Sequence, residues 1–353
     1  MFDGPVTDTA AERRARLRLA LSPRIGPVNF QEALQHFGSA RRACRELPPK
    51  LAVAPEDDLV REDRALTGVG GRFLVLGDED YPQALAVLAD APPVLSAIGD
   101  VGLLARPTLA IVGARDASLA GRRFAADLAA TLGEAGFVIV SGLARGIDTA
   151  AHEAALPTGT VAVLAGGIDQ IYPRQNEGLY RAVAGRGLLL AESPFGTPPI
   201  ARSFPRRNRI VSGLSAGVIV IEAAEQSGSL ITAQRASDQG REVFVFPGSP
   251  MDPRYAGSNN LIREGAILVR DANDIMSVFG KPQVASQHIE TPRKTAGDSV
   301  TAKVLEALGS VPTAVDELVR RCQVSAATVA EVLTALELEG RLERHRGNSV
   351  SLI

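Results

Sequence analysis

Residues 137–152 read FVIVSGLARGIDTAAH, and this stretch decides the fold. Its first four residues are apolar, and a glycine-broken turn separates them from an alanine-rich segment. That order predicts a buried strand, a loop and then a helix. In parallel α/β folds ligands bind at such junctions, because the start of the helix offers free N–H groups and the positive end of its dipole.

The loop of this stretch has the residues that an anion needs. Gly142 and Gly146 allow the backbone to approach a ligand closely, and Arg145 places a fork-shaped cation beside them. Together with Ser141, these residues indicate a site for a phosphate-bearing ligand.

The same alternation of strand and helix extends over residues 71–280. We predict further strands at 72–76, 109–112, 161–164, 188–191, 218–221, 243–246 and 266–269, with helices between most of them. Apolar strands separated by helices are typical of a parallel sheet covered on both faces. The expected fold class is therefore α/β, with a central, extended Rossmann-like parallel sheet.

Smaller modules are expected on both sides of this domain. Residues 1–70 predict helices at 12–21, 29–37 and 39–46, and the Gly/Pro turn at 22–28 is typical of a SAM-like or helix-hairpin-helix module. The amides of such a turn can contact a DNA backbone, but a packing or protein-interaction module explains the pattern equally well. Residues 281–297 are polar with two prolines, which predicts a linker.

Residues 298–353 predict a winged helix: helices at 300–308, 313–321 (capped by Thr313) and 325–339 (opened by Ser325), then a hairpin around Gly347-Asn348. The third helix carries three glutamates and neither arginine nor lysine. Major-groove readers need basic and amide side chains, so a protein-contact surface is favoured there. The wing residues Arg341, Arg344 and Arg346 could touch a DNA backbone.

Composition excludes several classes of protein. The 353 residues carry a net charge of −2, with 45% hydrophobic and 22% charged residues, as in ordinary globular proteins. Apolar runs are too short for a transmembrane helix, and the N-terminus lacks a signal pattern, so we expect a cytoplasmic protein.

Cys44 and Cys322 are expected to be plain thiols, and metal-binding motifs are absent from the sequence. None of the four lysines falls between residues 71 and 280, so the long basic side chains there are arginines. An arginine can bind a phosphate through two of its nitrogens.

Two more strand ends carry candidate binding residues. Gly113 and Arg115 follow the strand at 109–112, in a loop that is neither a Walker A motif nor a full dinucleotide fingerprint. Arg174 and Asn176 follow the strand at 161–164, and the nearby Tyr172 could stack on a base or simply pack.

The densest positive cluster lies at residues 202–211. Arginines alternate there with an aromatic ring and an amide, a mixture that suits single-stranded nucleic acid although many charge runs are only solvated faces. The candidate residues are Phe204, Arg206, Arg207, Asn208 and Arg209.

The strand at 218–221 is followed by Glu222 and then by small polar residues. Ser227, Gly228, Ser229 and Thr232 form a candidate anion nest or helix cap. Glu222 is the best acid/base candidate in the chain, unless it pairs with an arginine. Asp148 and His152, one helical turn apart, favour a structural pair over a catalytic one.

Six ordered blocks resemble the DNA-processing protein A (DprA/Smf) family. They are IVGAR at 111–115, SGLARGIDTAAH at 141–152, GGIDQIYPRQN at 166–176, FPRRNRIVSGLS at 204–215, SGSLITAQRA at 227–236 and FPGSP at 246–250. The resemblance implies a non-enzymatic protein without cofactors that binds and protects incoming single-stranded DNA. It further implies loading of RecA in natural transformation, a homodimer through the Rossmann-like domain, and single-strand-binding protein as a further candidate partner.

The resemblance also implies that Arg115 and Arg174 contact phosphates. Many relatives have lysine at the position of Arg174.

Two other functions stay open from the residues alone. One is a nucleotide-processing enzyme of the lysine-decarboxylase-like Rossmann group, although residues 225–230 read EQSGSL where that group has a Pro-Gly-Gly-x-Gly-Thr loop. The other is a regulator that binds duplex DNA through the winged helix.

Overall fold

The computed structural model describes residues 10–280, 282, 304–305, 307–308, 313–322, 324–338, 342–345 and 349–352. The chain divides into two compact units, with the division between Val284 and Ala285. Apart from Pro282, the expected linker lies outside the described residues.

The first unit begins with a small helical module. Its elements are α1 (Ala10–Ala20), α2 (Pro27–Phe37), α3 (Ala40–Glu46), η1 (Pro49–Leu51) and α4 (Glu56–Gly68). The first three helices confirm the prediction, and α4 was not predicted. Phe30 and Leu19 are fully buried at the centre of the module, and the Ser39 side chain caps α3.

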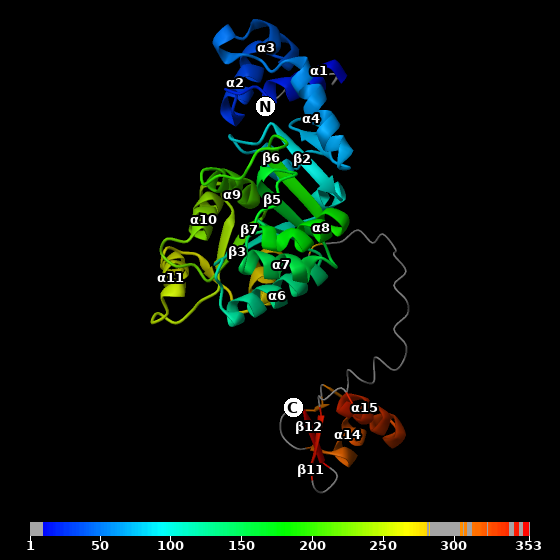
Figure 1. Ribbon diagram of the computed structural model, residues 1–353. Coiled ribbons are helices and arrows are strands. Elements are labelled where there is room, and N and C mark those ends of the chain that lie inside the picture. The colour runs from blue at the N-terminus through cyan, green and yellow to red at the C-terminus, as the bar shows by residue number, and fades with distance from the viewer. Residues whose placement is uncertain are drawn as a thin grey trace. The chain divides into compact units, whose positions relative to one another are not determined.

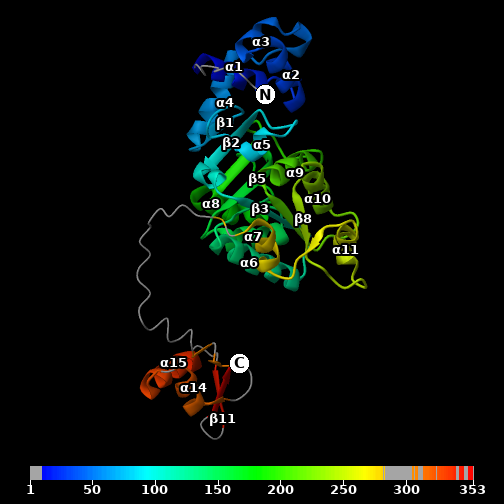
Figure 2. The same ribbon diagram turned by 180° about the vertical axis from the view of Figure 1, so that it is seen from behind.

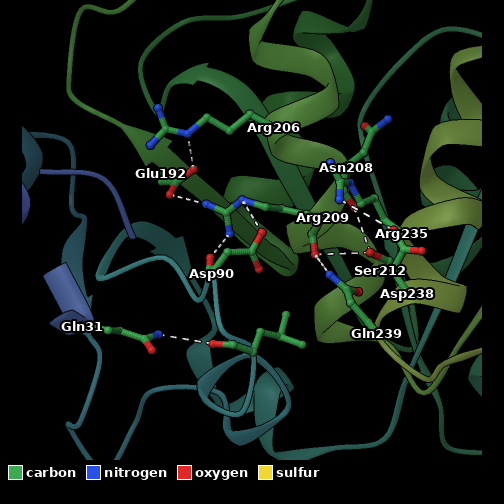
Figure 3. Close-up of polar contacts among 11 residues, drawn as sticks. Gln31, Asp90, Glu192, Arg206, Asn208, Arg209, Ser212, Arg235, Asp238 and Gln239 are labelled. Carbon is green, nitrogen blue, oxygen red and sulfur yellow. Dashed lines mark hydrogen bonds and ion pairs between the residues drawn. The ribbon is translucent and has the colours of Figure 1, made fainter. Parts of the chain in front are cut away.

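Side-chain hydrogen bonds tie this helical module to the sheet that follows. Arg13 on α1 donates to the Asp78 carboxylate at 2.7 Å and to the Phe73 carbonyl at 3.1 Å. Gln31 on α2 donates to the Leu88 carbonyl at 3.3 Å, as Figure 3 shows. The turn between α1 and α2 is therefore held at one position beside the sheet.

A nine-stranded sheet forms the centre of the unit, in the order β1-β2-β6-β5-β4-β3-β7-β8-β9. The strands are β1 (Arg72–Val75), β2 (Val94–Gly99), β3 (Thr108–Gly113), β4 (Val138–Ser141), β5 (Thr160–Gly167), β6 (Leu188–Ser193), β7 (Gly217–Ile221), β8 (Glu242–Val245) and β9 (Ile267–Leu268). The parallel pairing from β6 to β9 confirms the Rossmann-like expectation.

The prediction was wrong at one end of the sheet, where β2 was missed. β1 pairs with β2 and β2 pairs with β6, in both cases antiparallel. The connection from β1 to β2 holds only the short helix α5 (Gln83–Ala86) and no long crossover helix. A parallel pair needs such a crossover, so the first two strands extend the sheet in the antiparallel sense.

Helices cover both faces of the sheet (Figures 1 and 2). On one face α6 (Leu119–Glu134), α7 (Ile147–Ala155) and α12 (Ala272–Phe279) pack against Ile111, Ile139 and Ile219. On the other face α9 (Ser203–Leu214) and α10 (Gly228–Asp238) pack against Val112, Val140 and Val220. Successive strand residues thus enter opposite cores, as the two-residue period of a strand requires.

The remaining elements of the first unit connect or flank these layers. They are η2 (Val101–Ala105), η3 (Arg174–Asn176), α8 (Glu177–Arg186), η4 (Pro253–Tyr255) and α11 (Ala256–Arg263). Among the helices that the structure describes, none combines the length and the apolar character needed to cross a membrane.

The second unit has the elements of a winged helix. They are β10 (Thr313–Ala314), α14 (Val315–Cys322), α15 (Ala326–Leu338), β11 (Leu342–His345) and β12 (Ser349–Leu352), and the strands form an antiparallel sheet in the order β10-β12-β11. Ser325 accepts the Thr328 amide at 3.2 Å and caps α15 as expected. Thr313 instead belongs to a strand, because it pairs with Val350. Arg341, Arg346 and the 347–348 turn lie outside the described residues, as does the Arg344 side chain.

Candidate functional site

Two adjoining pockets lie at the carboxyl edge of the parallel strands. The first, of about 480 Å³, is lined by the loops after β3, β4 and β5, and we call it the Arg174 pocket. The second, of about 740 Å³, reaches the start of α10, and we call it the α10 pocket. Both are lined by Arg115, Gly142, Ala144, Phe204 and Arg207, so they form one groove, the strand-edge groove.

Three flat side chains meet where the two pockets join. The Arg115 guanidinium lies 5.2 Å from the centroid of the Phe204 ring, within cation–π range. The Phe204 ring is also 5.6 Å from Tyr172, measured between ring centroids, and the two rings are tilted to each other. Tyr172 is 47% exposed, so this cluster presents an aromatic surface to solvent. Of the two roles open to Tyr172 in the sequence, the exposed position favours stacking on a ligand.

Three arginines place positive charge around the Arg174 pocket. Arg145 pairs with Asp116, with 3.2 Å between nitrogen and oxygen, and stays half exposed. Arg115 and Arg174 are exposed, and within the described part of the chain neither forms an ion pair with a carboxylate. These two side chains are therefore available to an anionic ligand.

Arg207 lies beneath the groove as a buried cation. Its Nη1 donates to the Gly142 carbonyl at 2.6 Å and to the Val163 carbonyl. The guanidinium occupies the place where a Cβ on residue 142 would stand, which explains the glycine. Burial lowers the pKa of Arg207 to about 10, so it remains charged at neutral pH. Its field adds to that of the exposed arginines above it.

Buried acceptors fix the 142–146 loop. The Asp148 carboxylate accepts the Gly142 amide at 3.1 Å and the Ala144 amide at 3.3 Å, and burial raises the pKa of Asp148. His152 accepts the Leu143 amide at Nε2, and burial lowers its pKa to about 3. The neutral ring is thus an acceptor at pH 7, and both residues have the structural role that their spacing favoured.

Asn176 and Ser141 also support the loop from below. The buried Asn176 amide donates to the Leu143 carbonyl at 2.9 Å, and Leu143 has a φ of 57°, in the left-handed region. The Ser141 hydroxyl is fully buried and donates to the Ile111 carbonyl at 2.6 Å. Both were expected to bind the ligand, but their side chains position the backbone that lines the groove.

Glu222, the acid/base candidate of the sequence, does not line the strand-edge groove. It is fully buried, its carboxylate accepts the Ser118 amide and the Tyr255 hydroxyl, each at 2.8 Å, and it also contacts the Ser118 hydroxyl. Among the described residues, it forms no ion pair with an arginine either. Its φ of 54° turns the chain sharply after β7. Glu222 therefore anchors the start of α6.

The start of α10 completes the groove. Ser227, the cap of α10, contacts the Ser229 hydroxyl at 2.7 Å, and Asn208 donates to the Gly228 carbonyl at 3.3 Å. Thr232 lines the same pocket, although it is only 2% exposed. These residues adjoin Arg115 as expected. Arg254 also lines this pocket and was not predicted from the sequence.

Arg209 and Arg206 lie elsewhere on α9 (Figure 3). Arg209 is buried, where it pairs with the Glu192 carboxylate and donates to the Asp90 carbonyl at 2.6 Å. Arg206 pairs with the other Glu192 oxygen at 2.9 Å. Arg209 does not line the groove, because residues two apart on a helix point to different sides and Arg207 faces the groove.

The structure thus gathers most of the expected residues around one groove. They are Gly113, Arg115, Gly142, Arg145, Arg174, Phe204, Arg207, Asn208, Ser227, Gly228, Ser229 and Thr232. Gln170 and Pro199 also line it, and no strand-end pattern in the sequence marked them. Among the described residues, no three His, Cys, Asp or Glu side chains come close enough to hold a metal ion.

A family model described as DNA recombination-mediator protein A matches residues 72–280, more than half of the chain. The chain belongs to this family. Two further models, the DprA-like N-terminal HHH domain and the DprA winged helix domain, match residues 10–64 and 289–348. The resemblance to the DprA/Smf family is thereby confirmed.

Relatives in several bacteria cover most of the chain. Protein Smf of Escherichia coli is 39% identical over 78% of this chain and 75% of its own length. A putative DNA processing protein DprA of Mycobacterium tuberculosis is 36% identical over 92% and 87%.

Two solved DprA structures share the fold. The Streptococcus pneumoniae protein superposes with a TM-score of 0.66 and 34% identity, covering 74% of this chain and 95% of its own. The Helicobacter pylori protein, described for its unique single-stranded DNA binding mode, gives a TM-score of 0.55 and 33% identity, covering 59% and 95%.

Proposed function

We propose that the strand-edge groove binds single-stranded DNA and that the protein is a non-enzymatic recombination mediator. The observation that carries this proposal is the cluster of Arg115, Phe204 and Tyr172, which lines the same pocket as the unpaired Arg174. Arginines suit phosphates, and exposed rings suit unpaired bases whatever their sequence. The single-stranded DNA binding of the Helicobacter pylori relative supports the same assignment.

The geometry favours a single strand over a duplex. Bases of a duplex are stacked on one another and hide their faces, whereas a single strand can lay a base on Tyr172 or Phe204. Arg115, Arg145 and Arg174 then hold the flanking phosphates. The start of α10 adds amide N–H groups for a further phosphate.

The finer role is proposed on the resemblance to the family. We propose that the bound strand is protected and that RecA is loaded onto it, in the cytoplasm, during natural transformation. We also propose that the protein forms a homodimer through its central domain and that single-strand-binding protein is another partner. In the winged helix, we propose that the wing contacts DNA through Arg341, Arg344 and Arg346. We also propose domain limits at 1–70, 71–280 and 298–353, with a linker at 281–297.

Competition binding tests the proposal. A labelled, unstructured oligonucleotide is bound to the full chain, and unlabelled single strand or matched duplex is added. We expect the single strand to compete far better than the duplex. Equal competition would contradict the groove assignment and favour the winged helix.

The nucleotide-processing alternative has its own test. The groove could hold a mononucleotide, but its acid candidate Glu222 is buried on Ser118 and Tyr255. Incubation with nucleoside monophosphates should therefore release no base. Sustained release that Glu222→Ala abolishes would favour the enzyme instead.

A further inference from the structure

The strand-edge groove does not end at the Arg174 pocket. A hollow of about 150 Å³ shares Leu164, Ala165 and Arg207 with it and lies between the ends of β5 and β6 and the start of α9. A further hollow of about 320 Å³ shares Glu192, Arg202 and Arg206, among others, with the 150 Å³ hollow. The hollows follow one another along the carboxyl edge of the sheet, and we call this row of hollows the channel.

The far wall of this channel belongs to the N-terminal helical module. Ser22, Pro23, Ile25, Gly26 and Pro27, which form the turn between α1 and α2, line the last hollow. The bonds of Arg13 and Gln31 to the sheet side hold this turn in place. The helix-hairpin-helix turn that the sequence singled out therefore faces the same channel as the groove.

Arg202 gives the channel a free positive charge. It is exposed, and among the described residues it pairs with no carboxylate. The channel's carboxylates are already engaged: Glu192 pairs with Arg206 and Arg209, and Glu62 accepts the Phe195 amide at 2.6 Å. Burial also raises the pKa of Glu62.

The turn at residues 22–27 and the residues beside it offer further contacts to a single strand of DNA. Gly26 precedes α2 without any side-chain cap, and Pro27 has no N–H, so the amides of Val28 and Asn29 are the ones at this helix start that remain for a ligand. Ile200, 43% exposed, provides an apolar surface in the same hollow. A phosphate at the turn and at Arg202, with a base against Ile200, would use each of these features.

We propose that the single strand held in the strand-edge groove continues past Arg202 to the turn at residues 22–27. The helical module then forms the second half of one binding site. This inference rests on the function proposed above, and it requires an oligonucleotide long enough to leave the groove.

Two substitutions in the full chain test the channel. Arg202→Ala removes its free charge. Gly26→Asp puts a carboxylate on the far wall, and it fits because the φ of −80° suits any residue and a Cβ would meet nothing within 4 Å. Aspartate is a good helix cap, so folding should be preserved. Gly26→Asn caps the same amides without charge, and Arg123→Ala on α6 removes an exposed arginine elsewhere.

Oligothymidines of about 4 and about 16 nucleotides, the range of site sizes known for OB folds that bind single strands, serve as probes. We expect Arg202→Ala and Gly26→Asp to bind the short probe like the unsubstituted protein. Both should bind the long probe several-fold more weakly, and Arg202→Ala should lower its log–log salt slope by about 0.7. Gly26→Asn should lie between Gly26→Asp and the unsubstituted protein.

The outcomes separate the two proposals. If Arg202→Ala and Gly26→Asp bind both probes like Arg123→Ala, while Arg115→Ala weakens both, the channel is wrong and the groove stands. If Arg115→Ala also leaves both probes unaffected, the proposed function itself fails. A loss confined to the long probe supports the channel.

Discussion

The Arg115 guanidinium lies over the Phe204 ring at the junction of the two pockets, 5.2 Å from its centroid. Arg115 follows β3 and Phe204 lies in the first turn of α9, so the contact joins the two sides of the groove. At an exposed site such a contact contributes about 0.5–1 kcal/mol, enough to orient the arginine before a ligand arrives. The stack is therefore present in the free protein.

Phe204→Leu should weaken single-strand binding. The leucine keeps the apolar volume but removes the flat face for a base and the ring under Arg115. Stacking contributes about 1–3 kcal/mol per base, so we expect a loss of roughly 5- to 150-fold in affinity. Fluorescence anisotropy with a labelled oligothymidine measures it. Phe204→Tyr is the control, and equal affinities of Phe204→Leu and Phe204→Tyr would contradict the stack.

Arg207→Met should destabilise the fold. It removes the cation that faces Asp148 and the donor to the Gly142 and Val163 carbonyls. Leaving these buried carbonyls without their donor costs about 1–3 kcal/mol each in the free energy of unfolding. Arg206→Met, one residue away at an exposed position, should cost no more than about 1 kcal/mol. Denaturant unfolding compares them, and similar midpoints would refute the buried role.

His152 should make stability depend on pH. Burial lowers its folded-state pKa from 6.5 to about 3, so the unfolded chain takes up the proton first as the pH falls. The free energy of unfolding should therefore decrease by about 1.4 kcal/mol per pH unit from roughly pH 6.5 down to 3. Unfolding curves of His152→Gln should lack this component. Parallel pH profiles for both proteins would show that the ring is protonated in the folded state.

Glu222→Gln should affect the fold and not ligand binding. The carboxylate accepts from Ser118 and Tyr255, and a glutamine replaces one charge-assisted acceptor with a weaker one. We expect a loss of about 1–3 kcal/mol in the free energy of unfolding and unchanged single-strand affinity. A stable variant with lost affinity would place Glu222 in the site.

The loops at the strand ends could be predicted because they are determined by residues that are neighbours in the sequence. Apolar β-branched runs followed by glycine turns placed Arg115, Gly142 and Arg174 at one edge of the sheet, as the structure has them. Strand β2 was missed because Ser96 interrupts a short run after two prolines, and its antiparallel pairing depends on distant strands.

The roles of individual side chains were harder to predict, because they depend on which residues pack together in the folded chain. Arg207 and Arg209 belong to one positive run, and helical geometry alone requires them to face different sides, a signal that the sequence did contain. Glu222 gave no such signal, because its partners Ser118 and Tyr255 come from distant parts of the chain. Its burial follows from how three loops meet after the chain folds.

Salt titration of single-strand binding tests the central claim most directly. The unsubstituted protein, Arg115→Ala with Arg174→Ala, and the surface control Arg123→Ala are titrated with salt against one labelled oligothymidine. Each lost phosphate contact should lower the log–log slope by about 0.7, so the double variant should lose about 1.4 together with affinity. An unchanged slope and affinity in the double variant would contradict the groove as the DNA site.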